Sequence, residues 1–384
     1  MDGIYFDNAA TSFPKAPGVG TAMAEMVEQN GVNIGRGGYE SAYELAAMVM
    51  DTRMRLKKLF HGMKSGEVCF SMGVTQSINQ FLKGLLRPGD HIVVSSMEHN
   101  AVMRPLYVLQ QSGVEASIVP CRADGTFLLE LLECYITENT KAVLCTHASN
   151  VCGTILPVKE IGEICRKYGL FFAVDAAQTA GVLPINVEEM QIDFLAFPGH
   201  KGLRGPQGVG GFWIRNDLAE VMTPLMEGGT GSRSDLEIQP DFLPDKFESG
   251  TLPLPAIAGL HQALVVLEEL GTEAIRRKEE QLTWQFLDGL AEFSGIRVAG
   301  ITQRERMQQR LGVVSVDFGE LDNAQIAFYL EQKARIMTRV GLHCAPSAHK
   351  TLGTFPQGTV RFSFGPENTK EEVEQCLQAL RQIL

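Results

Sequence analysis

The stretch KAVLCTHASNVCGTILPVKEIGEICRKYGLFFAVDA, residues 141–176, decides the fold class of this chain. Two short apolar runs, at 141–147 and 170–176, flank the segment 158–169, in which apolar residues recur at helical spacing. A strand, a helix and a second strand in this order form a βαβ unit, whose two strands lie parallel in one sheet. The stretch therefore predicts an α/β fold.

The same alternation extends from residue 67 to residue 215. Further apolar runs occur at 91–97, 115–121 and 193–199, and a second helical pattern occurs at 101–111. They predict a largely parallel sheet that is covered by helices on both faces, and such sheets bind ligands beyond the carboxyl ends of their strands. Polar residues at the strand ends are therefore the candidates for a functional site.

The composition limits the classes of function. The chain has 384 residues, of which 45% are hydrophobic and 21% are charged, as in ordinary globular proteins with more than one hydrophobic core. Its formal net charge of -11 argues against a nucleic-acid or anionic-membrane partner, because such surfaces are bound mainly by clustered Lys and Arg. We therefore expect a small-molecule substrate or a protein partner.

Neither a metal site nor a membrane segment is predicted. The eight cysteines form no CxxC pair, and no histidine cluster has the spacing of a zinc site. The start MDGIYFDNAA lacks a signal-peptide pattern, and no run approaches the ~20 apolar residues of a membrane helix. The expected location is the cytoplasm, where thiols stay reduced.

The segment TLPLP, residues 251–255, interrupts the alternating pattern. A long helical pattern follows at 273–293, and strand-like runs follow at 312–318 and 359–364. We place a domain boundary at residue 255.

Two residues indicate a cofactor. Lys201, in FPGHKG, directly follows an apolar run and lies among glycines, although a lone lysine is more often a solvated surface charge. Asp175, in VDAAQ, ends another apolar run, where a carboxylate is costly to bury unless it meets a cation or donors. A protonated pyridine nitrogen is such a cation. A lysine that forms a Schiff base and an aspartate on the ring nitrogen together are typical of pyridoxal-phosphate enzymes.

With these residues the chain resembles the cysteine desulfurases, which are fold-type-I pyridoxal-phosphate enzymes, and within them the SufS-like short-loop group that includes selenocysteine lyases. The shared motifs follow in order over nearly the whole chain: DNAAT, GVTQSIN, EHNAV, SNVCGT, VDAAQ, GHKG, ESGT, GLHCA and VRFSFG. The resemblance implies a large domain, residues 14–255, on a mostly parallel seven-stranded sheet. It also implies a smaller α+β domain, made of residues 1–13 and 256–384.

The resemblance assigns roles around the cofactor ring. It makes Lys201 the Schiff-base lysine and pairs Asp175 with the pyridine nitrogen. Asn150 and Gln178 would contact the phenolic oxygen of the cofactor. His99, in EHNAV, would stack on the ring, although a hydrogen-bonded loop histidine is the simpler interpretation of such a residue.

Another set of residues is implied for the phosphate. Thr75, Gln76 and Ser77 open a helix after EVCFS, where free N–H groups and the helix dipole suit an anion. His200 would lie next to the phosphate or the lysine. Thr251, in ESGT, would reach the phosphate of the other subunit, which implies a homodimer.

One residue departs from the family pattern. Many relatives have a serine before Gly-His-Lys and use its hydroxyl on the phosphate, whereas this chain has Pro198, which offers neither a hydroxyl nor a backbone N–H. Ser77, His200 and the partner subunit's Thr251 are the candidates that could compensate.

Cys344 is the candidate nucleophile. It lies in TRVGLHCAPSAHK between Gly and Pro, which favours a loop, whereas Cys69, Cys145 and Cys165 lie in apolar patterns and look structural. A free cysteine is most often a small buried hydrophobic residue, but the resemblance makes Cys344 the thiolate that accepts sulfur as a persulfide.

The same C-terminal region contains the candidate substrate contacts. Arg361, in VRFSFG, matches an arginine that binds the substrate carboxylate, and the alternative is a surface salt bridge. Arg339 and Asn33 or Arg36 are expected to line the same pocket. His343 either tunes the pKa of the neighbouring thiol or points away from it.

The expected function is conversion of L-cysteine to L-alanine, with a persulfide on Cys344 that passes to an acceptor protein for iron–sulfur cluster or thio-cofactor synthesis. Three alternatives stay open at this point. They are a selenocysteine lyase, an aminotransferase or epimerase of the same fold, and a catalytically silent sulfur-relay or scaffold protein.

Overall fold

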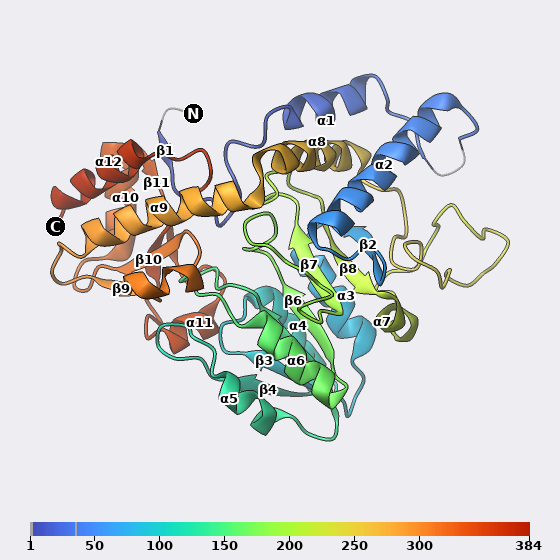
Figure 1. The fold of residues 1–384 in the computed structure, drawn as a ribbon, viewed down its shortest axis with the longest axis horizontal. Coiled ribbons are helices and arrows are strands. Elements are labelled where there is room, and N and C mark those ends of the chain that lie inside the picture. Colours follow the sequence, from blue (N-terminus) through green and yellow to red (C-terminus); the bar gives the residue numbers. More distant parts are fainter. Residues whose placement is uncertain (1–2, 35–36) are drawn as a thin grey trace.

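The structure is a computed structural model that describes residues 3–34 and 37–384. Its larger part contains a seven-stranded sheet with the strand order β2-β8-β7-β6-β5-β3-β4 (Figure 1). β8 is antiparallel to both of its neighbours, and all other neighbours are parallel, which confirms the predicted mostly parallel sheet. The strands are β2 (Gly66–Ser71), β3 (His91–Ser95), β4 (Glu115–Val119), β5 (Thr140–Thr146), β6 (Phe171–Asp175), β7 (Phe194–Pro198) and β8 (Gly210–Arg215).

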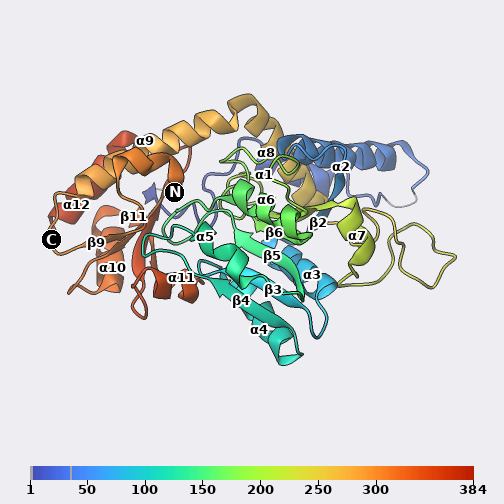
Figure 2. The same cartoon turned by 60° about the horizontal axis from the view of Figure 1, so that its bottom comes forward.

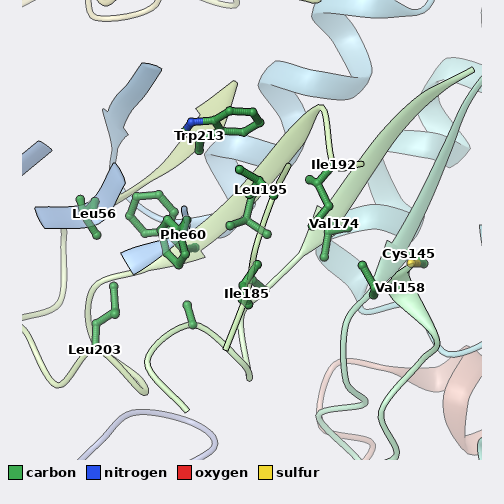
Figure 3. Packing of buried hydrophobic residues seen from close by; sticks show 14 of the residues in the cluster. Leu56, Phe60, Cys145, Val158, Val174, Ile185, Ile192, Leu195, Leu203 and Trp213 are labelled. Carbon is green, nitrogen blue, oxygen red and sulfur yellow. The ribbon is translucent and has the colours of Figure 1, made fainter. Parts of the chain in front are cut away.

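Helices cover both faces of this sheet because alternate side chains of each strand point to opposite faces. In β5, Val143 and Cys145 join one hydrophobic core, whereas Ala142 and Leu144 join another. Figure 3 shows the first core, in which Leu195 of β7 lies between Phe60 and Val174 of β6. The helices of the larger part are α1 (Val19–Glu28), α2 (Glu40–Leu59), α3 (Val74–Leu85), α4 (Asn100–Gln111), α5 (Leu129–Leu132), η1 (Glu133–Tyr135), α6 (Val158–Tyr168) and α7 (Asn216–Val221).

The smaller part contains a separate antiparallel sheet with the strand order β12-β13-β10-β9. Figure 2 shows α9 running from the larger part to this sheet, where Phe286 of α9 packs on Phe362 of β13 with ring centroids 4.8 Å apart. The elements of this region are α9 (Thr272–Leu290), β9 (Arg297–Ala299), η2 (Arg304–Gln309), β10 (Val313–Asp317), α10 (Asn323–Ala334), β11 (Ile336–Met337), β12 (Arg339–Gly341), α11 (Pro346–Thr351), β13 (Thr359–Ser363) and α12 (Lys370–Arg381).

Two segments connect the parts. Near the start of the chain, β1 (Ile4–Tyr5) pairs in parallel with β11 of the smaller part. α8 (Leu254–Leu270) packs on α1 and α2, and its buried side chains belong to the core of the larger part. The division of the chain after residue 255 stays a prediction. α8 begins at Leu254, next to this proposed boundary, and packs with the larger part.

Across residues 3–34 and 37–384, the structure has no helix that is both long and apolar enough to span a membrane.

Candidate active site

A cavity of about 610 Å³ lies beyond the carboxyl ends of β5, β6 and β7, beside the first turn of α3. Its volume is in the range of small-molecule sites, about 300–1,000 Å³. Most of the residues predicted to contact the cofactor line this cavity: Thr75, Gln76, His99, Asn150, Asp175, Gln178, His200 and Lys201. The position of the cavity was therefore predicted correctly from the sequence, because parallel sheets bind ligands beyond the carboxyl ends of their strands.

Asp175 ends β6, and only 2% of its surface is exposed. Its Oδ1 accepts a hydrogen bond from the backbone N–H of Ala177 at 2.8 Å. Burial raises the pKa of this carboxyl, and the nearby Lys201 and the Ala177 hydrogen bond oppose that rise. A carboxylate in this position favours a positively charged ligand group, such as a protonated ring nitrogen.

Lys201 lies in the turn after β7 and faces the same cavity. Burial lowers the pKa of its amine to about 8, Asp175 opposes this, and Arg361 and Arg339 lower it further. Because the neutral amine is the form that attacks a carbonyl, this environment makes Lys201 a better nucleophile than a surface lysine.

His99 caps the N-terminus of α4, where its Nδ1 accepts a hydrogen bond from the backbone N–H of Ala101 at 3.0 Å. Burial lowers the pKa of the ring to about 4, and the charge of Lys201 adds to this effect. The ring is therefore neutral at physiological pH, with its proton on Nε2. A neutral, flat ring on the cavity wall can stack on an aromatic ligand.

The first turn of α3 offers an anion site. No side chain caps this helix at its N-cap residue Gly73, so the backbone N–H groups of the first turn remain available to bind an anion. Thr75 and Gln76 line the cavity, but Ser77 does not. The fully buried Ser77 hydroxyl lies 3.1 Å from the carbonyl oxygen of Gly211 and 2.9 Å from the hydroxyl of Ser71. The Ser77 side chain, which was predicted to contact the phosphate, is therefore directed into the protein and away from the cavity.

His200 is connected to the N-terminal loop by residues that sequence reasoning did not single out. Its Nδ1 lies 3.1 Å from Thr11 Oγ1, and the Lys15 ammonium donates to Thr11 Oγ1 at 2.9 Å and to the carbonyl of His200 at 3.0 Å. Burial lowers the pKa of Lys15 to about 8 and that of His200 to about 4. Pro198 ends β7 opposite Gly210 and also lines the cavity.

Cys344 is exposed and does not line the cavity. Its backbone is left-handed, with a φ of 58°, and its carbonyl accepts a hydrogen bond from the backbone N–H of Asn100 at 2.8 Å. The side chain of Asn150 donates to the carbonyl of His343 at 2.8 Å. These bonds hold the cysteine loop beside His99 and Asn150, two residues of the cavity wall.

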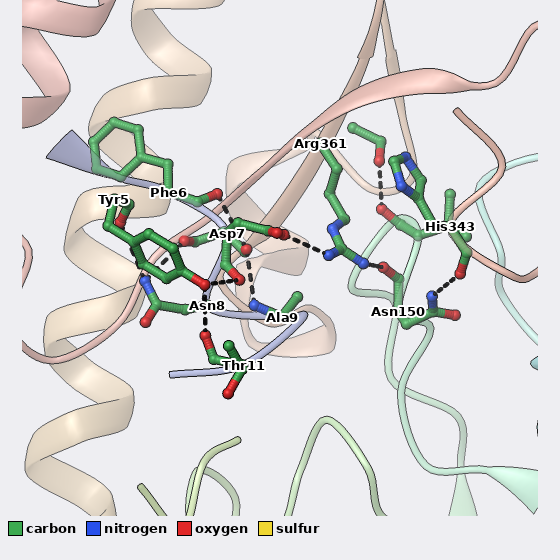
Figure 4. Close-up of polar contacts among 12 residues, drawn as sticks. Tyr5, Phe6, Asp7, Asn8, Ala9, Thr11, Asn150, His343 and Arg361 are labelled. Atoms are coloured by element: carbon green, nitrogen blue, oxygen red, sulfur yellow. Dashed lines mark hydrogen bonds and ion pairs between the residues drawn. The ribbon is translucent and has the colours of Figure 1, made fainter. Parts of the chain in front are cut away.

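Arg361 lies on β13 with only 2% of its surface exposed, so the predicted alternative of a surface salt bridge does not describe it. Its Nη2 lies 2.7 Å from Asp7 Oδ1, and its Nη1 donates to the carbonyl of Asn150 at 3.1 Å (Figure 4). Arg339 is the register partner of Arg361 on β12. The ion pair with Asp7 was not predicted, although the acid stands in the DNAAT motif.

The ring of His343 turns toward β13. Its Nε2 lies 3.0 Å from Thr359 Oγ1, and its ring packs on that of His349 with centroids 5.4 Å apart. Burial lowers the pKa of His343 to about 2, and the charge of Arg361 contributes. Of the two interpretations left open by the sequence, this geometry favours the one in which His343 points away from the thiol.

Like Ser77, Cys344, Arg339 and Arg361, the predicted residues Asn33 and Thr251 do not line this cavity. Asn33 follows α1 and is exposed, and Arg36 lies outside the described residues. Thr251 is exposed and does not line the cavity of its own protomer. Its loop is anchored three residues earlier, where Glu248 accepts two hydrogen bonds from the guanidinium of Arg53 at 2.7 and 2.5 Å.

Comparisons with known proteins agree over the whole chain. The family model of aminotransferase class-V matches residues 4–376. The chain is 34% identical over 390 residues to a probable cysteine desulfurase of Halalkalibacterium halodurans, covering 98% of this chain and 92% of that protein. It is 32% identical over 388 residues to a probable cysteine desulfurase of Methanothermobacter thermautotrophicus, covering 100% and 95%.

Solved structures agree as well. The apo structure of a cysteine desulfurase from Thermococcus onnurineus superposes with a TM-score of 0.90 and 31% identity, covering 100% of this chain and 94% of that one. The cysteine desulfurase CsdA from Escherichia coli gives a TM-score of 0.87 and 29% identity, covering 99% and 94%. The similarity therefore includes both the larger and the smaller part.

Proposed function

Because this chain belongs to the aminotransferase class-V family and its homologues include cysteine desulfurases, we propose that it is a pyridoxal-phosphate-dependent cysteine desulfurase. It converts L-cysteine to L-alanine and retains the sulfur as a persulfide on Cys344. The main supporting observation is that Lys201 and Asp175 face one cavity while hydrogen bonds from Asn100 and Asn150 hold the cysteine loop at its edge.

The residues of the cavity fit the cofactor. Lys201 would hold it through its amine, and Asp175 would keep the ring nitrogen protonated. His99 would stack on the ring, while Asn150 and Gln178 would bind its phenolic oxygen. When bound, pyridoxal phosphate supplies an electron sink that weakens bonds at the substrate carbons.

The phosphate end is supported by the open first turn of α3 and by His200. We assign the remaining contact to the partner subunit's Thr251, in a homodimer. Exposed apolar side chains at the cavity mouth support a covering subunit, because Met72 is 74% exposed and Met226 is 52% exposed.

The homodimer can be tested with mixed dimers of Thr251→Ala and Lys201→Ala chains. One site of such a dimer combines an intact lysine with an intact threonine from the other chain. Its cofactor affinity and activity should therefore exceed those of Thr251→Ala homodimers, which are measured in parallel. No gain in the mixed dimers would contradict the cross-subunit role.

The substrate side handles the carboxylate and the sulfur. Arg361 and Arg339 bind the carboxylate, and the thiolate of Cys344 attacks the substrate sulfur. The new sulfur–sulfur bond forms as the carbon–sulfur bond breaks. The electron pair of the broken bond stays with carbon, which takes up protons to become alanine. The exposed position of Cys344 supports transfer of the persulfide to an acceptor protein, which we place in cytoplasmic iron–sulfur cluster assembly.

The experiment that tests this function locates the sulfur. The holoenzyme is treated with L-cysteine, alkylated and digested, and mass mapping should find one extra sulfur on the Cys344 peptide together with free alanine. Cys134, the other exposed cysteine among the described residues, provides the matched control, since Cys134→Ser should behave like the wild type. A keto acid product, or sulfur on another peptide, would contradict the proposal, and turnover of selenocysteine alone would identify a selenocysteine lyase.

A further inference from the structure

Two guanidinium groups lie side by side at the proposed substrate side. Arg339 and Arg361 are directly opposite each other on the antiparallel strands β12 and β13, so their side chains lie on the same face of the sheet. Both arginines lower the pKa of Lys201 and of His99, which means that their charges act on the cavity. Two positive charges therefore lie within electrostatic reach of the reacting amine.

Asp7 supplies one opposing charge. Its Oδ1 lies 2.7 Å from Arg361 Nη2, and its charge also raises the pKa of Lys201. The backbone fixes its position, because Asp7 pairs with Ser363 of β13 and its carbonyl accepts a hydrogen bond from the N–H of Ala10 at 3.0 Å. The aspartate is thus a fixed part of the charge balance, and among the described residues Arg339 forms no ion pair of its own.

Arg361 retains capacity for a further ligand. A guanidinium has five N–H donors, and here Nη2 contacts Asp7 while Nη1 contacts the carbonyl of Asn150. Its Nε is buried and has no hydrogen-bond partner among the described residues. The two contacts leave three of the five donors of Arg361 unused, so a carboxylate bound at one of these donors would not have to replace Asp7.

From this geometry we propose that Asp7 is a specificity-determining residue, which restricts the arginine pair to amino acids with one anionic group. The proposal rests on the function assigned above to Arg361. A substrate with a second carboxylate would meet the Asp7 carboxylate and only one positive charge that is not paired with Asp7. Asp7→Asn removes that negative charge and should make the site bind ligands with one carboxylate and ligands with two carboxylates.

The test measures binding and needs no turnover. Two probes differ by a single carboxylate and lack an amino group: 3-mercaptopropionate and mercaptosuccinate. Calorimetric titration of the wild-type holoenzyme should show tighter binding of the monocarboxylate. In Asp7→Asn the ratio of the two dissociation constants should shift by about tenfold toward mercaptosuccinate, the size expected when one partly screened charge is removed. A ratio within about twofold of the wild type would overturn the proposal.

A matched control and an opposite variant complete the test. Asp124 pairs with Arg306 at the same 2.7 Å distance and similar exposure, 25% against 20% for Asp7, but unlike Asp7 it is not among the main charges that shift the pKa of Lys201. Asp124→Asn should keep the wild-type ratio, and an equal shift there would overturn the proposal. Arg339→Gln keeps the Asp7 ion pair and removes one positive charge, so discrimination against mercaptosuccinate should increase by about tenfold. The absence of an increase would overturn the proposal even if Asp7→Asn did not fold.

The binding test and the persulfide test can fail separately. A desulfurase without this role of Asp7 would form the persulfide on Cys344 and show an unchanged ratio of dissociation constants. A protein with another reaction but the proposed selectivity would show the shifted ratio and no extra sulfur.

Discussion

Within one protomer, the residues proposed for the cofactor come from one run of strand and helix ends between residues 73 and 201, whereas those proposed for the substrate come from both ends of the chain. On the cofactor side, Asp175 is held by sheet pairing on both flanks, with Thr146 of β5 and Ala196 of β7 as register partners. On the substrate side, Arg361 meets Asp7 across 354 positions of sequence.

The two sides also differ in how they are anchored. The ladder of a parallel sheet positions the cofactor residues, so many hydrogen bonds would have to break before they moved. The cysteine loop depends on a few separate bonds, from Asn100 to the carbonyl of Cys344, from Asn150 to the carbonyl of His343, and between the ring of His343 and Thr359. We infer that the cofactor side is rigid and that the substrate side adapts during the reaction.

The largest effect is expected on the cofactor side. Lys201→Ala removes the amine that would hold the cofactor, so activity should fall by at least about 10³-fold. The dimer should stay intact, because Lys201 faces the cavity and forms no ion pair in the part of the chain that the structure describes. Activity assays beside sedimentation check this result, and retained activity with bound cofactor would show that another lysine has this role.

A smaller effect is expected when the cysteine loop on the substrate side loses an anchor while the cofactor stays bound. Asn150→Ala removes the bond to the carbonyl of His343 but none of the sheet ladder, so kcat should fall by about 10- to 100-fold while the cofactor stays bound. Hydrogen exchange at residues 342–345 should become faster, since the cysteine loop loses an anchor.

The control for this loop prediction is Asn186→Ala, which removes two remote hydrogen bonds, from the N–H groups of Glu188 at 3.1 Å and Glu189 at 3.0 Å. It should leave both kcat and the exchange at 342–345 unchanged. If Asn150→Ala left the exchange unchanged as well, the cysteine loop would be as rigid as the strand ends.

A third effect concerns the stability of the cofactor side as pH changes. Glu98 is fully buried behind the cavity, where Oε1 accepts hydrogen bonds from the Ser95 hydroxyl and from the N–H of Thr146, while Oε2 has no partner among the described residues. Burial raises its pKa to about 8, these hydrogen bonds oppose the rise, and Asp175 adds to it.

The sign of the pH effect follows from that pKa. The folded protein binds this proton more tightly than the unfolded chain, whose Glu pKa is about 4.3, so stability is full at low pH and falls as the pH rises toward 8. Glu98→Gln should remove a loss on the order of 3 kcal/mol over this range. Thermal unfolding between pH 5 and 8 measures the effect, with the surface variant Glu130→Gln as a control, and an unchanged slope in Glu98→Gln would show that Glu98 does not titrate there.

The sequence predicted most of the fold and the position of the cavity. Short apolar runs located the parallel strands, and β3 and β6 begin and end within two residues of the predicted runs at 91–97 and 170–176. Because parallel strands end at one edge, residues at strand ends such as Asp175 and Lys201 were predicted to meet there, and both line the cavity. These features depend on local pattern and on one topological rule.

Only the tertiary structure determined which partners the remaining polar groups meet. It directs the Ser77 hydroxyl toward Gly211 and turns His343 toward Thr359. It also pairs Arg361 with Asp7. Side-chain rotamers and contacts between distant segments depend on how the N-terminal loop packs on β13, and no local pattern records that packing. The sequence by itself therefore determined where the chemistry takes place, and the tertiary structure determined which charges face one another there.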